Sequence, residues 1–307
     1  MPKARLSANQ PGLREVLTVR SRAKVNVFLE VLGKRTDGYH ELDTVMLRTE
    51  LHDVLQLEFP EDVRSDEVRL TVIGDRRLTS AIPCDESNLI IKAARALRAA
   101  TGIHQPVSIT LQKRIPAQAG LAGGSSNAAA ALCALNRLWK TNLPQRSLHE
   151  IAAGLGSDIN FFVEDCRAAR CTGRGETVKP IALCGSPVVI VMRPQSGNST
   201  PRVFSELASL PSSELRSSDE ILAALKSGSL SQIRRAAFNR LTNAAVRLNP
   251  EMGEMLQAVQ RRTGLPVLMS GSGSTCFVVV ENVRRGRRLL SVLRNIDCSF
   301  LCLTRIH

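Results

Sequence analysis

The sequence predicts an α+β protein with two domains, a strand-rich first domain at residues 1–183 and a ferredoxin-like second domain at residues 184–307. The length of 307 residues suits two domains, because a domain typically has roughly 150 residues. Apolar and polar residues alternate in several short segments of the first half. The remainder follows the order strand, helix, strand, strand, helix, strand, which is typical of a split βαβ fold.

Several segments of the first domain have strand character, separated by polar or glycine-containing turns. The alternation is clearest in Val54-Leu55-Gln56-Leu57-Glu58. The predicted strands are Glu15–Val19, Val25–Leu32, Asp53–Phe59, Val68–Ile73 and Val107–Leu111.

Helical periodicity appears at residues 88–100, where Asp85 or Ser87 could supply the N-cap. Residues 126–138 are rich in alanine and almost uncharged, which predicts a helix that is buried on most of its circumference. Residues 147–154 indicate a short amphipathic helix that ends at a glycine.

A strand at residues 187–192 is predicted to open the second domain, and weakly helical sequence follows at residues 205–235. The remaining predicted elements are a helix at 251–263, strands at 266–269 and 275–281, a helix at 283–295 and a strand at 298–304.

The chain is strongly basic, with 41 Lys and Arg against 28 Asp and Glu, a net charge of +13 and a pI near 10.0. The positive electrostatic field of such a chain attracts polyanions, which include nucleic acids, acidic lipids and phosphorylated metabolites. Only 3% of the residues are aromatic, so a stacking platform for single-stranded nucleic acid is the weaker interpretation. No apolar run approaches the roughly 18 residues of a membrane span.

Eight cysteines are scattered without a C-x-x-C pair, a pattern that favours reduced, packed thiols over disulfides or a zinc site. The basic N-terminus lacks the apolar core of a secretory signal. We therefore expect a frayed arm in a cytoplasmic protein, with a short transit peptide as the alternative.

A glycine-rich segment between a strand and the buried helix is the most informative motif. Gly120, Gly123 and Gly124 allow a tight turn, and the helix that follows directs its free N–H groups and positive dipole into that turn. A phosphate fits there, and Ser125 and Ser126 add hydroxyl donors or a magnesium ligand. The segment is neither a Walker A loop nor a G-x-G-x-x-G fingerprint, and a tight turn with a serine cap is the alternative.

Two further segments carry polar groups that need an explanation. The SGSGST run at residues 270–275 could close over a phosphate chain or form a simple hairpin turn. Lys24 and Asn26 lie within an apolar strand, where an unpaired polar group is costly, so both are expected to have partners.

These three segments, in their order along the chain, resemble segments of the GHMP kinases, the family of galactokinase, homoserine kinase and mevalonate kinase. The resemblance runs from about Val19 to Val280 and is closest to the branch that acts on a CDP-linked methylerythritol. Four further segments carry it: GKRTDGYHELD at residues 33–43, NLI at 88–90, LGSDINFF at 155–162 and GRGE at 173–176.

The resemblance implies an ATP-binding first domain similar to ribosomal protein S5 domain 2 and a substrate-side second domain. It implies transfer of phosphate from ATP to the 2-hydroxyl of CDP-methylerythritol in the non-mevalonate route to isoprenoid precursors, with Mg²⁺. The expected partners are small molecules, without membrane or nucleic acid, in a monomer or weak homodimer. Another GHMP kinase, or a basic nucleic-acid-binding protein with an S5-like fold, is the alternative.

The resemblance also implies site residues. Asp158 would be the catalytic base and Lys24 its partner, although Asp158 alone could be an N-cap. The implied substrate contacts, Asp158 included, add Asn26, Tyr39, His40, Thr200, Phe204, Gly271 and Gly273. The implied ATP contacts are Asn88, Lys113, Pro116, Gly120, Leu121, Ala122, Gly123, Gly124, Ser125 and Ser126; the metal ligands stay open.

Within these sets, Tyr39 would stack on cytosine, His40 would bind its edge and Phe204 would oppose Tyr39, unless Phe204 only packs in the core. Asn88 and Lys113 would lie near adenine.

The chain departs from the family pattern at three places. Ala122 stands where the family usually has glycine, a change that we expect to be tolerated if its φ is negative. Asn239-Arg240-Leu241-Thr242 replaces a more acidic Asn-Asp-Leu-Glu. The basic run at residues 284–288 is expected to be a solvated helix face.

Overall fold

The structure is a computed structural model that describes residues 16–60 and 67–307. The expected N-terminal arm, up to residue 15, lies outside the described residues. Contacts divide the described chain into two compact units. Unit 1 holds residues 16–23, 51–60, 67–117 and 122–165, and unit 2 holds residues 24–50, 118–121 and 166–307. The predicted domain boundary at residue 183 stays a prediction.

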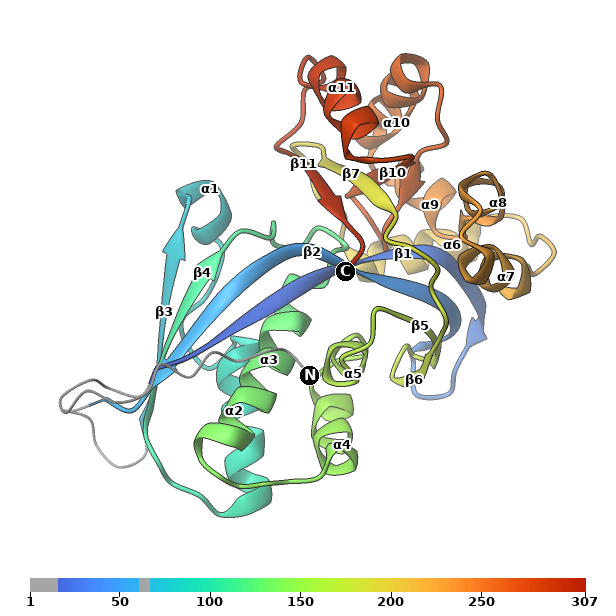
Figure 1. The fold of residues 1–307 in the computed structure, drawn as a ribbon. Helices are drawn as coiled ribbons and strands as arrows, with labels where there is room; N and C mark the ends of the chain where they lie inside the picture. Colours follow the sequence, from blue (N-terminus) through green and yellow to red (C-terminus); the bar gives the residue numbers. More distant parts are fainter. Residues whose placement is uncertain (1–15, 61–66) are drawn as a thin grey trace. The chain divides into compact units, whose positions relative to one another are not determined.

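Two long strands, β1 (Leu17–Lys34) and β2 (His40–Glu58), contribute to both units (Figure 1). The strands pair in the order β3-β4-β2-β1-β8, and β5 and β6 continue from β2 off this path. The two strands predicted at Glu15–Val19 and Val25–Leu32 are one strand in the structure. Ser21 lies between them and is buried, and its hydroxyl donates to Asn127 Oδ1 at 2.6 Å. Its polar group therefore has a partner, and the strand need not break there.

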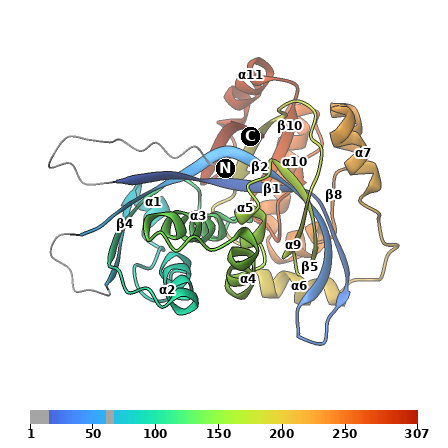
Figure 2. The same cartoon turned by 60° about the horizontal axis from the view of Figure 1, so that its bottom comes forward.

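Unit 1 combines a sheet with helices on one side of it (Figures 1 and 2). Strand β3 runs parallel to β4, and β4 is antiparallel to the outer part of β2. The elements are β3 (Val68–Gly74), α1 (Arg76–Thr79), α2 (Leu89–Thr101), β4 (Val107–Lys113), α3 (Gly123–Leu138), α4 (Gln145–Leu155) and α5 (Ile159–Val163).

The ends of three helices in unit 1 differ from expectation, and one of them, α4, begins at Gln145 rather than Ser147 and continues past Gly154 to Leu155. Asn88 caps α2, because its side chain accepts from Ile90 N at 2.9 Å, so neither Asp85 nor Ser87 is the cap. Helix α3 is buried on most of its surface as predicted, but it begins at Gly123 rather than at residue 126.

The end of unit 2 confirms the ferredoxin-like prediction. Its sheet has the all-antiparallel order β11-β7-β10-β9, and α10 and α11 pack together on it. The elements are β7 (Val188–Arg193), α10 (Pro250–Thr263), β9 (Leu268–Met269), β10 (Cys276–Val280), α11 (Val283–Leu293) and β11 (Phe300–Arg305). The basic run at residues 284–288 lies on α11 with its arginines exposed, as expected.

In the rest of unit 2, β8 pairs with β1, and β5 pairs with both β2 and β6. Its elements are β5 (Ala168–Gly173), β6 (Thr177–Pro180), α6 (Thr200–Ser209), α7 (Asp219–Ser227), α8 (Leu230–Ala236), β8 (Phe238–Asn239) and α9 (Thr242–Leu248). The short strands β5, β6 and β8 were not anticipated, because each is too short or too mixed in polarity to show a period.

All eight cysteines lie in the described part of the chain and are free thiols. Cys171 and Cys276 are buried as expected, whereas Cys84 and Cys184 are exposed, so the packing prediction is wrong for these two. Within residues 16–60 and 67–307, no helix combines the length and apolar character that crossing a membrane requires.

A buried ion pair joins β1 to the turn after β8. Glu30, whose side chain is inaccessible, accepts from the Arg240 guanidinium at 2.6 Å through each of its oxygens. It also accepts from the backbone N–H groups of Val31 and Arg216. Burial acts to raise the pKa of Glu30, but these hydrogen bonds and the Arg240 charge outweigh burial and lower it.

Replacing Glu30 by Gln should lower the free energy of unfolding at pH 7 by about 3 kcal/mol, because Arg240 loses its counter-charge. The folded-state pKa of Glu30 lies below the ordinary 4.5. The stabilisation is therefore complete above that pH and is lost as the pH falls through the folded value. Urea unfolding of the wild type and of Glu30→Gln should be measured between pH 7 and pH 3. The difference between their free energies of unfolding should shrink as the pH falls. Equal stability at pH 7 would contradict the assignment.

Candidate active site

A chain of buried polar groups runs through the centre of unit 2. Lys24 Nζ donates to Asn26 Oδ1 at 2.6 Å, and Asn26 Nδ2 donates to Thr44 Oγ1 at 2.8 Å. The Thr44 hydroxyl in turn donates a hydrogen bond to the carbonyl of Phe28 at 2.7 Å. Lys24, Asn26 and Thr44 are at most 3% exposed. Lys24 and Asn26, the polar residues of the otherwise apolar strand segment, therefore have partners. This was predicted from the free-energy cost of burying an unpaired polar group.

Both glycine-rich segments that the sequence singled out reach this polar chain. Ser270 Oγ lies 2.8 Å from the carbonyl of Gly120 and 3.2 Å from the Asn26 N–H, which donates to it. The backbone of Lys24 donates to the carbonyl of Leu121 at 3.2 Å. A Cβ at Gly120, whose φ is +71°, would lie 2.2 Å from the carbonyl oxygen of Ser270. Only glycine allows this approach of the two loops.

The loop at residues 270–275, called the second loop below, is held by side chains of two other segments. Asn239 Nδ2 donates to the carbonyls of Met269 and Gly271 at 2.9 and 2.8 Å. Thr200 shares a 2.7 Å hydrogen bond with the hydroxyl of Ser272. Sequence reasoning noted the Asn239 segment only as a departure and missed this role, because an asparagine at a short strand end carries no specific signal.

A Cβ at Gly273 would lie 2.8 Å from Asn198 Nδ2, so the second loop also needs its glycine. The loop turns between β9 and β10, but its contacts to Asn26 and Gly120 show that it is more than a hairpin turn.

His40 and Phe204 form an aromatic pair, and the placement of cytosine between Tyr39 and Phe204 stays a prediction. The rings of His40 and Phe204 stack with centroids 4.5 Å apart and planes at 23°. Tyr39 is 53% exposed and faces Arg174 instead. Burial, and then the charge of Lys34, lower the pKa of His40, so its ring is neutral at pH 7.

The start of the glycine-rich loop is fixed in unit 1 by a buried ion pair that the sequence did not reveal. Lys113 Nζ lies 2.7 Å from Asp53 Oδ2, and both side chains are at most 2% exposed. The other carboxylate oxygen accepts from the N–H groups of Arg114 and Ile115. Burial lowers the pKa of Lys113, and the nearby Asp53 only partly offsets this. The pair thus holds the chain where it enters the loop.

The ATP-side residues of unit 1 lie around the first turn of α3. Gly124 is exposed, Ser125 is half-buried and Pro116 is buried. The hydroxyls of Ser126 and Ser21 lie 2.7 Å apart, within hydrogen-bond distance. Asn88 caps α2 and donates to the carbonyl of Pro83, so its amide already serves the fold.

Asp158 stands at the N-cap position of α5, but its side chain makes no capping hydrogen bond. The alternative role that its sequence suggested is therefore wrong. Asp158 belongs to unit 1 and Lys24 to unit 2, so their pairing stays a prediction. Across the described residues, no group of three or more His, Cys, Asp or Glu side chains could hold a metal ion.

The sequence matches two known families, "GHMP kinases N terminal domain" at residues 88–163 and "GHMP kinases C terminal" at residues 221–296. A relative from Salinispora tropica is 39% identical over 93% of this chain and 90% of its own length. One from Pelotomaculum thermopropionicum is 36% identical over 92% and 95%. Both are named 4-diphosphocytidyl-2-C-methyl-D-erythritol kinase.

Solved structures agree. A "4-(cytidine 5'-diphospho)-2C-methyl-D-erythritol kinase" has a TM-score of 0.75 and 33% identity, over 94% of this chain and 98% of that chain. The mevalonate kinase of L. major has a TM-score of 0.73 with 14% identity, over 100% and 99%. At that identity the second likeness shows the fold alone.

Ala122 is the point where the structure overturns an expectation about the loop. Its φ is +52°, in the left-handed region, so the condition under which the methyl group would be harmless is not met. A residue with a Cβ costs free energy in this region, and glycine does not.

Replacing Ala122 by Gly should raise the free energy of unfolding by about 1 kcal/mol, since the backbone strain disappears. The matched control is Ala128→Gly inside α3, which should lower it by about 1 kcal/mol through lost helix propensity. Chemical denaturation measures both. A loss of stability in Ala122→Gly would contradict the strain argument.

Proposed function

Because the chain belongs to the 4-diphosphocytidyl-2-C-methyl-D-erythritol kinases of the GHMP kinase family, we propose the following reaction. The protein transfers the γ-phosphoryl group of ATP to the 2-hydroxyl of 4-CDP-2-C-methyl-D-erythritol, a step toward isoprenoid precursors by the non-mevalonate route. The observation that carries the proposal is the meeting of two glycine-rich loops at the buried Lys24–Asn26 pair. A phosphate chain and a fixed positive charge can be held together there.

The chemistry needs a base, a positive charge and good alignment. Asp158 accepts the proton of the substrate hydroxyl while the oxygen forms its bond to the γ-phosphorus and the bond to the β-phosphate oxygen breaks. Lys24 stabilises the charge on the transferring group. The Lys24 ammonium group has three N–H donors, and one of them is bound to Asn26 Oδ1. This hydrogen bond fixes the direction of the other two N–H groups.

The nucleotide phosphates bind at the first turn of α3. The free N–H groups and the positive end of the helix dipole favour an anion there. Gly124 is exposed, and a Cβ on it would meet only Leu89, at 3.7 Å, so a phosphate can approach the backbone. Asn88 and Lys113 lie near the adenine of the bound nucleotide in this proposal.

Mg²⁺ fits this site with few protein ligands, because it is usually bound by substrate phosphates and water plus one or two protein oxygens. The hydroxyls of Ser125 and Ser126 are oxygens of the right kind. The ion would neutralise charge on the phosphates.

The substrate base is bound by His40, Phe204 and Tyr39. The neutral His40 ring has one donor and one acceptor for the cytosine edge, and the stacked His40 and Phe204 rings provide a flat aromatic surface. Thr200, Gly271 and Gly273 lie on or beside the second loop and complete this side.

The remaining assignments follow the same family. We place the domain boundary at residue 183, the protein in the cytoplasm, and its state as a monomer or weak homodimer. Eight free thiols suit a reducing compartment. The alternative of a basic nucleic-acid-binding protein is not favoured, because the relatives are named as kinases.

Incubation with Mg-ATP and the CDP-linked substrate should release one ADP for each phosphorylated product. A coupled assay measures the ADP, and ³¹P NMR measures the phosphorylated product. Asp158→Asn should lower kcat by about 10² to 10⁴-fold, because the proton acceptor is lost. The matched control is Glu150→Gln, which removes an equally negative but exposed carboxylate from the same unit and should keep full activity. No ADP release, or an unchanged Asp158→Asn, would refute the assignment.

A further inference from the structure

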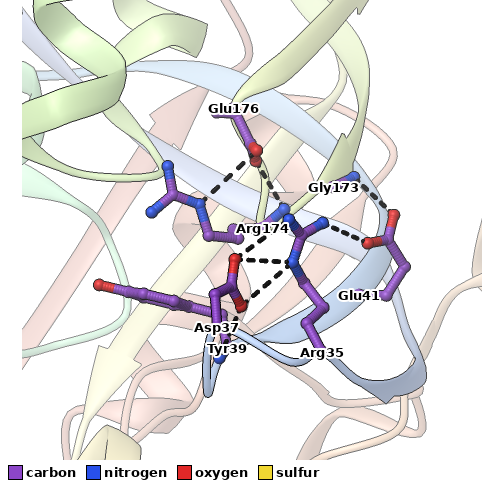
Figure 3. Close-up of polar contacts among 7 residues, drawn as sticks. All are labelled: Arg35, Asp37, Tyr39, Glu41, Gly173, Arg174 and Glu176. Carbon is purple, nitrogen blue, oxygen red and sulfur yellow. Dashed lines mark hydrogen bonds and ion pairs between the residues drawn. The ribbon is translucent and has the colours of Figure 1, made fainter.

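The DGYHEL segment forms a stiff hairpin between β1 and β2. Asp37 accepts from the N–H of Tyr39 at 3.1 Å and from the Arg35 guanidinium (Figure 3). The backbone N–H of Arg35 donates to the carbonyl of Tyr39 at 2.8 Å, and Gly38 has a φ of +86°. These bonds fix the backbone of Tyr39 although its side chain is largely exposed.

The GRGE segment, which the proposed function leaves without a role, lies against this hairpin. Glu41 accepts from Arg35 at 2.7 Å and from the N–H of Gly173 at 3.2 Å, so it joins the two turns (Figure 3). Glu176 accepts from the backbone N–H of Arg174, and its other oxygen lies 3.6 Å from Arg174 Nε. The Arg174 side chain is thus anchored at its base and along its length.

The guanidinium of Arg174 covers one face of the Tyr39 ring, with its central carbon 4.8 Å from the ring centroid. All these residues belong to unit 2. Arginine suits this place better than lysine, because its planar group stacks flat on a ring. With 53% of Tyr39 still exposed, the ring remains accessible to a second planar group.

We propose that Arg174 is a positioning residue for the substrate base: it holds the Tyr39 ring in the orientation in which its accessible surface stacks on cytosine. This inference rests on the proposed function, because it takes a cytidine-containing substrate as given. A ring that is already held in the free protein loses less conformational freedom on binding. Glu176 partly neutralises Arg174, which favours this role over a direct contact with the diphosphate.

Tyr39 is the single tyrosine of the chain, so ¹³C-labelled tyrosine reports on this ring alone. Arg174→Met should shift the ring signals of the free protein and reduce the further shift that cytidine causes. Its KM for the CDP-linked substrate should rise about three- to tenfold, whereas kcat and the KM for ATP stay within twofold. Arg174→Lys should recover part of the affinity.

Lys179→Met is the matched control, since it removes one positive charge from an exposed position on β6. It should leave both the Tyr39 signals and the KM unchanged. Equal melting temperatures of wild type and Arg174→Met exclude a general loss of folding.

The proposal is overturned if Arg174→Met leaves the Tyr39 signals and KM as in wild type. It is also overturned if the variant binds CDP more weakly but cytidine equally well, because Arg174 would then act on phosphate. Absence of turnover in the wild type would sink the proposed function, whereas cytidine titration of the Tyr39 signals still decides the role of Arg174.

Discussion

The buried ammonium of Lys24 is the constraint on which the centre of unit 2 depends. A charged group that is 3% exposed is stable only with hydrogen-bond partners, because burial removes its water. Asn26 supplies one of them, and Asn26 is in turn held by Thr44 and Ser270. Ser270 then contacts the carbonyl of Gly120, so satisfying one cation also brings the two glycine-rich loops together.

Other buried charges of the chain organise loops in the same way. Asp53 and Glu30 each accept from a basic side chain and from two backbone N–H groups. Such an arrangement uses both oxygens of a carboxylate, which is the condition under which a buried ion pair is tolerated. Each pair fixes backbone beside the candidate site: Asp53 at the entry to the phosphate loop, and Glu30, through Arg240, next to Asn239.

The two short motifs of the resemblance act on one another through their turns. Every charged residue of the DGYHEL hairpin has a partner that shapes either that hairpin or the GRGE turn. Gly38 and Gly173 both have positive φ values, so neither turn would form as easily with another residue. The aromatic surface for the substrate base therefore depends on backbone geometry set by residues that need not touch the substrate.

The sequence by itself determined the fold class, the ferredoxin-like order of the second domain, the two glycine-rich loops and the need of Lys24 and Asn26 for partners. These follow from local periodicity and from the cost of burying a polar group. Only the tertiary structure decided that Thr44 and Ser270 supply the further partners, that His40 rather than Tyr39 faces Phe204, and that Ala122 has a positive φ. These contacts join residues that are 18 to 244 positions apart, so they depend on which distant segments the fold packs together, and no local periodicity encodes that.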